Sequence, residues 1–138
     1  MFILVATLAA SSLVAIQQTH TQREREKQLL FVGDQYRRAI SSYRGVFPAG
    51  GSRAWPRSIE DLLNDTRFPS PVHHLRQAYP DPMTGQVDWE LIVENNGVVG
   101  IRSRSTLKPI KEVGFSNDYR DFERRGAYRE WEFRVRVP

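Results

Sequence analysis

The chain has 138 residues, the length of one ordinary domain, and a formal net charge of +4. It contains no cysteine, so disulfide bonds and thiolate metal sites are excluded. Acidic and basic residues alternate along most of the chain without a long block of like charges, so we expect no nucleic-acid partner.

The first segment, residues 1–16, is apolar and uncharged, and the first charged side chain is Arg23. A secretory signal peptide would begin with basic residues, which this segment lacks, although small residues near Ala10 keep that reading open. A buried helix would show a polar stripe, which is missing here. We therefore predict a membrane anchor over residues 1–22. Because the apolar stretch is shorter than the roughly 20 residues a bilayer requires, we expect the span to begin upstream of Met1.

An amphipathic segment follows without Pro or Gly before Gly33, which predicts one unbroken helix from the N-terminus to about Tyr43. Its apolar residues recur at steps of three and four and share one face; they are Leu29, Val32, Tyr36, Ala39, Ile40 and Tyr43. We interpret this face as core and not as a partner-binding stripe. Residues 23–27 form a charged collar, in which Glu24 and Lys27 are spaced to pair on the exposed surface.

The middle of the chain contains two local signals. Ser58 and Asp61 resemble a capping box, which predicts a short helix over residues 59–64. The segment 79–85 carries Asp-Pro followed by Gly, which predicts a tight turn.

Three strands are expected after that turn. Asn96-Gly97 favours a hairpin turn between strands at 89–93 and 98–103. Near the end of the chain four apolar residues alternate with charged ones, which predicts the clearest strand; they are Trp131, Phe133, Val135 and Val137. We expect Trp131, Phe133 and Val135 to face the long helix. The predicted class is α+β, a long helix packed on a small antiparallel sheet, with a soluble head spanning residues 23–138.

No catalytic or ligand-binding motif is present. The sequence lacks a nucleophile elbow, a phosphate loop and a dinucleotide fingerprint, so we expect neither enzymatic activity nor a cofactor. His73 and His74 are adjacent but have no third ligand at a supporting spacing. We interpret both histidines as solvated loop residues and expect no metal.

Three features carry a resemblance: the apolar helix that runs into an amphipathic one over residues 1–40, the segment 55–63 with Trp-Pro and Leu-Leu, and the Asp-Pro turn at 79–85. Together they resemble the type IV pilin-like proteins, specifically the pseudopilins of type II secretion systems. The family's leader has no counterpart, because Met1 aligns inside the family's apolar helix. Asn117, Asp118 and Asp121 lack the spacing of the calcium loop found in some members, so calcium is not expected.

The resemblance implies a structural subunit of a bacterial type II secretion or type IV pilus-like filament, held in the inner membrane with its head in the periplasm. Its partners would be other pilin-like subunits and the inner-membrane assembly machinery. Assembly would use small residues of the anchor and collar charges paired between neighbours; the residues assigned are Ala6, Ala9, Ala10, Arg23, Glu24, Arg25, Glu26 and Lys27. The alternative is a solitary membrane-anchored periplasmic domain that binds a partner or ligand.

Overall fold

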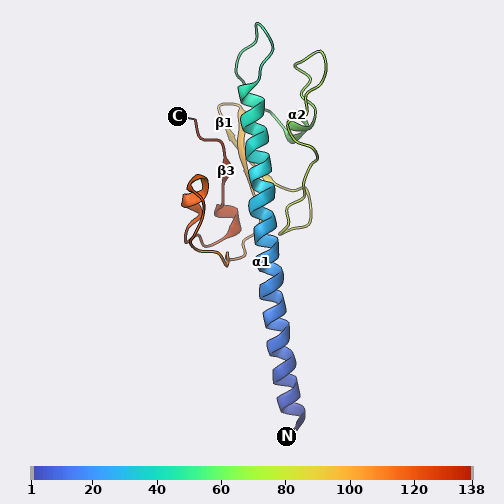
Figure 1. Ribbon diagram of the computed structural model, residues 1–138, viewed down its shortest axis with the longest axis vertical. Helices are drawn as coiled ribbons and strands as arrows, with labels where there is room; N and C mark the ends of the chain where they lie inside the picture. Colours follow the sequence, from blue (N-terminus) through green and yellow to red (C-terminus); the bar gives the residue numbers. More distant parts are fainter. Residues whose placement is uncertain (1, 138) are drawn as a thin grey trace.

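One long helix, α1 (Phe2–Gly45), organises the protein and projects from a small head, as Figure 1 shows. The computed structural model describes the backbone of residues 2–137 and the side chains of residues 11–137. The predicted unbroken helix is confirmed, because no loop separates its apolar first half from its amphipathic second half. The predicted core face is also confirmed, since Leu29, Tyr36 and Ile40 are fully buried.

Gly33 marks the point where the helix and the sheet come closest. A Cβ atom built at this position would overlap the ring of Phe133. Phe133 is fully buried and belongs to the last strand, so the ring packs directly on the helix backbone. The single glycine inside an otherwise regular helix therefore makes room for an aromatic side chain.

We predict that Gly33→Ala destabilises the protein despite the better helix propensity of alanine. Overpacking costs about 1–3 kcal/mol, whereas the exchange gains about 1 kcal/mol in propensity, so we expect a net loss of about 1 kcal/mol. Gly45→Ala is the matched control, because nothing lies within 4 Å of its added Cβ. Denaturant unfolding of the full chain in detergent micelles measures both variants. Equal stability of the two would show that Phe133 does not press on the helix.

The sheet has three antiparallel strands in the order β1-β2-β3, which confirms the α+β class. They are β1 (Glu90–Glu94), β2 (Gly97–Arg102) and β3 (Phe133–Arg134). The predicted hairpin is present, but its turn lies one residue earlier, at Asn95 and Asn96, whose φ angles are 52° and 62°. Gly97 is required for a different reason, since an added Cβ there would overlap Trp55.

The last strand is much shorter than the alternation of its residues predicts. The alternation itself is correct: Trp131 and Phe133 are fully buried and Val135 is partly buried, but Val137 is 55% exposed. Only Phe133 and Arg134 pair with β2, and one further backbone bond joins the Val135 N–H to the Val99 carbonyl. The β1–β2 register also shifts at Val99. Burial in an aromatic cluster therefore holds this segment more than a long hydrogen-bonded ladder does.

The remaining elements are short. The predicted helix in the middle of the chain is α2 (Ile59–Leu63), and two 3₁₀ turns not predicted from the sequence are η1 (Asn117–Phe122) and η2 (Tyr128–Glu130). The capping box is wrong: Ser58 makes no capping bond, and Asp61 instead accepts the Arg57 N–H at 2.8 Å.

The predicted Asp-Pro turn is present and is held from within. The Asp81 carbonyl accepts the N–H groups of Thr84 and Gly85. The Asp81 carboxyl group is buried, accepts the Met83 N–H and binds the Ser103 hydroxyl at 2.5 Å. Burial raises the pKa of Asp81. The Tyr36 hydroxyl of α1 donates to the Tyr79 carbonyl at 2.8 Å, so the turn connects α1 to Ser103 just after β2.

Candidate assembly surface

The stalk, defined as residues 11–21 of α1, is exposed on all sides. Its apolar side chains Leu13, Val14 and Ile16 are 68%, 56% and 67% exposed. Such a run of exposed aliphatic groups marks a surface that meets lipid or protein. Ala6, Ala9 and Ala10, the small residues assigned to assembly, lie outside the described side chains. Within the described part of the chain, no helix has both the length and the apolar character needed to cross a membrane.

Four of the five collar residues are exposed, as predicted: Arg23, Glu24, Arg25 and Lys27. Glu24 and Lys27 form the predicted ion pair, with Lys27 Nζ 3.3 Å from Glu24 Oε1. The prediction for Glu26 is wrong, because this residue is only 5% exposed and points into the head. The alternation of signs along the sequence concealed this, because the helix turns each successive side chain by about 100°.

The Glu26 carboxylate holds the coil segment that follows β2. Oε2 accepts the Ile110 N–H at 2.9 Å, and Oε1 accepts the Lys111 N–H at 3.0 Å. The Tyr128 hydroxyl donates to the same carboxylate at 2.7 Å. A buried carboxylate with three donors is a satisfied charge, and we call this arrangement the Glu26 grip.

Gln22 extends this grip by one turn towards the stalk. Its Nε2 atom donates to the Lys108 carbonyl at 2.9 Å and lies 3.1 Å from the Tyr128 hydroxyl. Burial, together with the nearby Glu26 carboxylate, raises the pKa of Tyr128 to about 12, so its hydroxyl stays protonated as a donor. Contact between helix and head thus begins at Gln22, one residue before the predicted boundary.

Because Glu26 is buried, the exposed part of the collar carries a net positive charge. The exposed members are three cations, Arg23, Arg25 and Lys27, and one acid, Glu24, which gives a net charge of +2. Collars of two neighbours cannot therefore balance each other. Arg25 also lines a groove where the stalk meets the head, together with apolar Val14, Met83 and Leu107. The junction therefore combines one cation and three apolar side chains with the polar residues Gln17, Gln18, Thr21 and Gln22.

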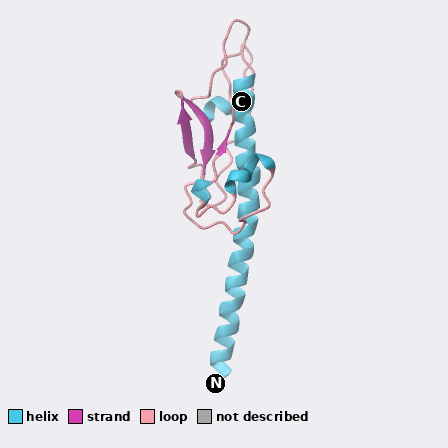
Figure 2. Cartoon of the chain, turned by 90° about the vertical axis from the view of Figure 1, so that its left-hand side faces the viewer, coloured by secondary structure: helices cyan, strands magenta, loops and turns pink. Residues whose placement is uncertain are grey.

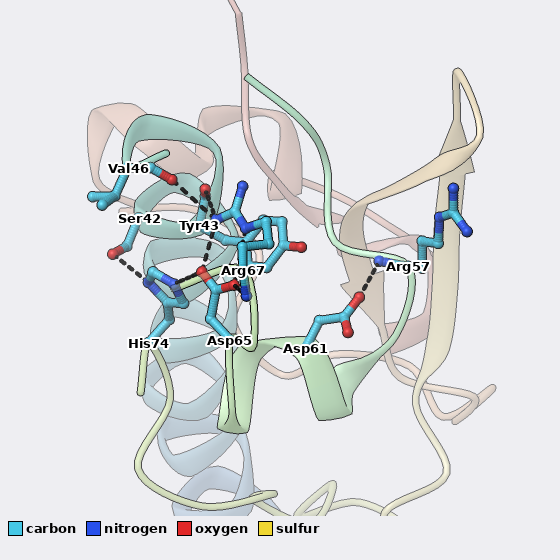
Figure 3. Close-up of polar contacts among 8 residues, drawn as sticks. All are labelled: Ser42, Tyr43, Val46, Arg57, Asp61, Asp65, Arg67 and His74. Atoms are coloured by element: carbon cyan, nitrogen blue, oxygen red, sulfur yellow. Dashed lines mark hydrogen bonds and ion pairs between the residues drawn. The ribbon is translucent and has the colours of Figure 1, made fainter. Parts of the chain in front are cut away.

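A second polar cluster fastens the other end of α1, as Figure 3 shows. Arg67 Nη2 donates to the carbonyls of Tyr43 and Val46 at 2.9 and 3.0 Å, which caps the helix. Asp65 binds Arg67 through both carboxylate oxygens, at 2.9 and 2.7 Å. Hydrogen bonds from Arg67 hold the pKa of Asp65 well below its usual range, against the opposing effect of burial.

His74 belongs to the same cluster, so its interpretation as a solvated loop residue is wrong. Its Nε2 lies 2.9 Å from Asp65 Oδ2, its Nδ1 lies 2.7 Å from Ser42 Oγ, and its side chain is 1% exposed. His73 is exposed, as predicted.

The Ser42, His74 and Asp65 chain has the residue types of a hydrolytic triad, but its setting differs. Ser42 lies in the last turns of α1, where helical bonding occupies the backbone N–H groups that would have to stabilise an oxyanion. The Asp65 carboxylate is committed to Arg67. We interpret the cluster as a lock on the helix end. The prediction that the chain is not an enzyme stays a prediction.

Comparisons with known proteins identify no relative of this chain. No family model, no curated protein and no solved structure matches the chain. Among the described residues, no group of three His, Asp or Glu side chains is arranged to hold a metal ion. The exposed stalk, the cationic collar and the Glu26 grip are therefore the features on which a functional assignment rests.

Proposed function

We propose that this chain is a pseudopilin-like structural subunit of a bacterial type II secretion or type IV pilus-like filament. Its anchor lies in the inner membrane, its head lies in the periplasm, and its partners are other pilin-like subunits and the assembly machinery. The observation that carries the proposal is the continuity of α1: one helix bears exposed aliphatic residues in its stalk and the core face of the head in its second half.

The physics of assembly follows from this helix. In lipid, apolar helices associate through close packing, and the small residues Ala9, Ala10 and Ser11 allow near approach. The collar follows the apolar segment after the uncharged polar residues 17–22, which would place it near the lipid headgroups. Its net charge of +2 attracts lipid phosphates, which holds each subunit at one height in the membrane. This replaces the expected pairing of collars between neighbours.

The alternative function is a solitary anchored periplasmic domain that binds a partner or ligand. The same head and anchor would serve it, but its stalk would not contact another copy. Because the chain has no cysteine, Leu13→Cys places a single thiol on the stalk, and oxidation in membranes reports whether stalks of two copies meet.

We predict that the Leu13→Cys chain gives disulfide-linked dimers, and that two changes reduce them. One is the joint reversal of Arg23, Arg25 and Lys27 to Glu, which repels lipid phosphates; the other is Leu at both Ala9 and Ala10. Single reversals should have little effect, since an exposed charge contributes about 0–1 kcal/mol. The control reverses three exposed head arginines, Arg53, Arg57 and Arg76, to Glu. Absence of dimers in the Leu13→Cys chain itself would favour the solitary domain. Dimers unchanged in both variants would show that neither the collar nor the small residues of the anchor drive assembly.

A further inference from the structure

The sheet leaves one hydrogen-bonding edge open. β1 is the outer strand, and Figure 2 shows it at the margin of the sheet on the side away from α1. Among the described residues, the backbone groups of β1 bond only within the β1–β2 ladder. Val93 in this strand is 61% exposed. An open edge with apolar residues is a surface to which another strand can add.

The two faces of this edge have different chemistry. Glu90 and Glu94 lie on the outer face, in a network of ion pairs that reaches β3 through Arg102, Glu132 and Arg134. Leu91 and Val93 point to the other face. Leu91 there lines a hollow of about 210 Å³, whose other apolar members include Ile59, Leu63 and Trp89 and which Ser58 and Glu60 also line. An added strand must match acids on one face and aliphatic groups on the other.

Two copies of β1 do not satisfy this requirement. In a centred antiparallel pair, Glu90 of each copy would lie opposite Glu94 of the other. Like charges directly across a strand pair are destabilising. Symmetric pairing of β1 with itself is therefore disfavoured.

The chain carries a segment with the required pattern at the opposite edge of its sheet. Arg134 and Arg136 alternate with Val135 and Val137. Arg134 lies on the acidic face, across from Ile92 through Gly100. In a sheet continued from one copy to the next, both arginines would therefore lie on the face of Glu90 and Glu94. Both valines would lie on the face of Leu91 and Val93.

We propose that residues 134–137 of one subunit add to β1 of the next subunit and continue its sheet. This inference rests on the proposed function, since subunits of a polar filament share one orientation and so present opposite sheet edges to each other. The contact is heterologous and does not close on itself, which suits an open assembly. Arg136 must leave Asp121, 2.8 Å away, but the two side chains are 61% and 40% exposed and a pair so exposed is weak.

The test uses membranes that contain the full chain with two added thiols, Val93→Cys and Val137→Cys. Mild oxidation should give a ladder of head-to-tail oligomers, whereas each single variant should give none. The matched control pairs Val137→Cys with Val113→Cys, whose parent residue is exposed to a similar degree, 56%. An equal ladder from the control would overturn the inference.

A charge exchange tests the same contact independently. Glu94→Arg placed in the Val93→Cys chain, or Arg136→Glu placed in the Val137→Cys chain, should each lower cross-linking with an unchanged partner by about fivefold. The mixture of both altered chains should restore it. If Val93→Cys and Val137→Cys gave no cross-links while Leu13→Cys still gave dimers, the edge contact alone would be overturned. Loss of the Leu13→Cys dimers as well would overturn the proposed function.

Discussion

Phe133→Ala should lower the free energy of unfolding by about 3–5 kcal/mol, the range for deleting a buried aromatic ring. The ring is fully buried, lies against the backbone of Gly33 and packs edge-on to Tyr119 and Phe122, with centroids 5.6 and 5.1 Å away. The deleted ring would leave a cavity between α1 and η1, and the residues around it can fill that cavity only in part. Denaturant unfolding in detergent micelles, followed by tryptophan fluorescence, measures the loss.

Val137→Ala is the control for this experiment, because the side chain belongs to the same alternating series but is 55% exposed. Its loss should stay within about 0.5 kcal/mol. If the two variants lost equal stability, the assignment of Phe133 to the core would be wrong. A selective loss in Phe133→Ala would support the burial of this strand even though only two of its residues pair in the sheet.

Glu26→Ala should lower the free energy of unfolding by about 3 kcal/mol or more. It leaves the N–H groups of Ile110 and Lys111 and the hydroxyl of Tyr128 without their acceptor. The Tyr128 hydroxyl is buried, the two N–H groups are partly buried, and an orphaned buried donor costs about 1–3 kcal/mol. Glu26→Gln should lose less, because its amide oxygen still accepts. The same unfolding measurement applies.

The control is Glu24→Ala, an exposed collar residue two positions away, with an expected loss below about 1 kcal/mol. A double-mutant cycle of Glu26→Ala with Tyr128→Phe should show a coupling of about 0.5–3 kcal/mol, since the two side chains bond directly. Equal losses for Glu24 and Glu26 would mean that the Glu26 side chain lies outside the head. Zero coupling would remove Tyr128 from the grip.

Periodicity predicted the parts of the fold that repeat over many residues. The step of three and four from Leu29 to Tyr43 identified the core face of α1, and alternation around Phe133 identified its buried side. Short local motifs predicted the fold less completely than periodicity did. Asn96-Gly97 pointed to the hairpin but not to the position of its turn, because Gly97 contacts Trp55, a residue far from it in the sequence.

The candidate surface was predictable only in part for the same reason. Glu26 has the same local sequence context as Glu24, and only the arrival of Ile110 and Lys111 distinguishes the two. His74 was indistinguishable from His73 until Asp65 and Ser42 were brought to it. A signal was nonetheless present: Arg67 and Asp65 lie two residues apart, a spacing that permits a local ion pair.

The position of the Glu26 grip has a mechanical consequence for the filament subunit that we propose. The grip lies where α1 enters the head, and the Arg67 cap lies where α1 ends. A push or pull along the stalk travels up the helix and reaches the head at both places together with the core face between them. These contacts run side by side along the helix, so an axial force shears all of them at once and does not peel them one after another. The head should therefore follow the displacement of its stalk as a rigid body, with little lag between the two.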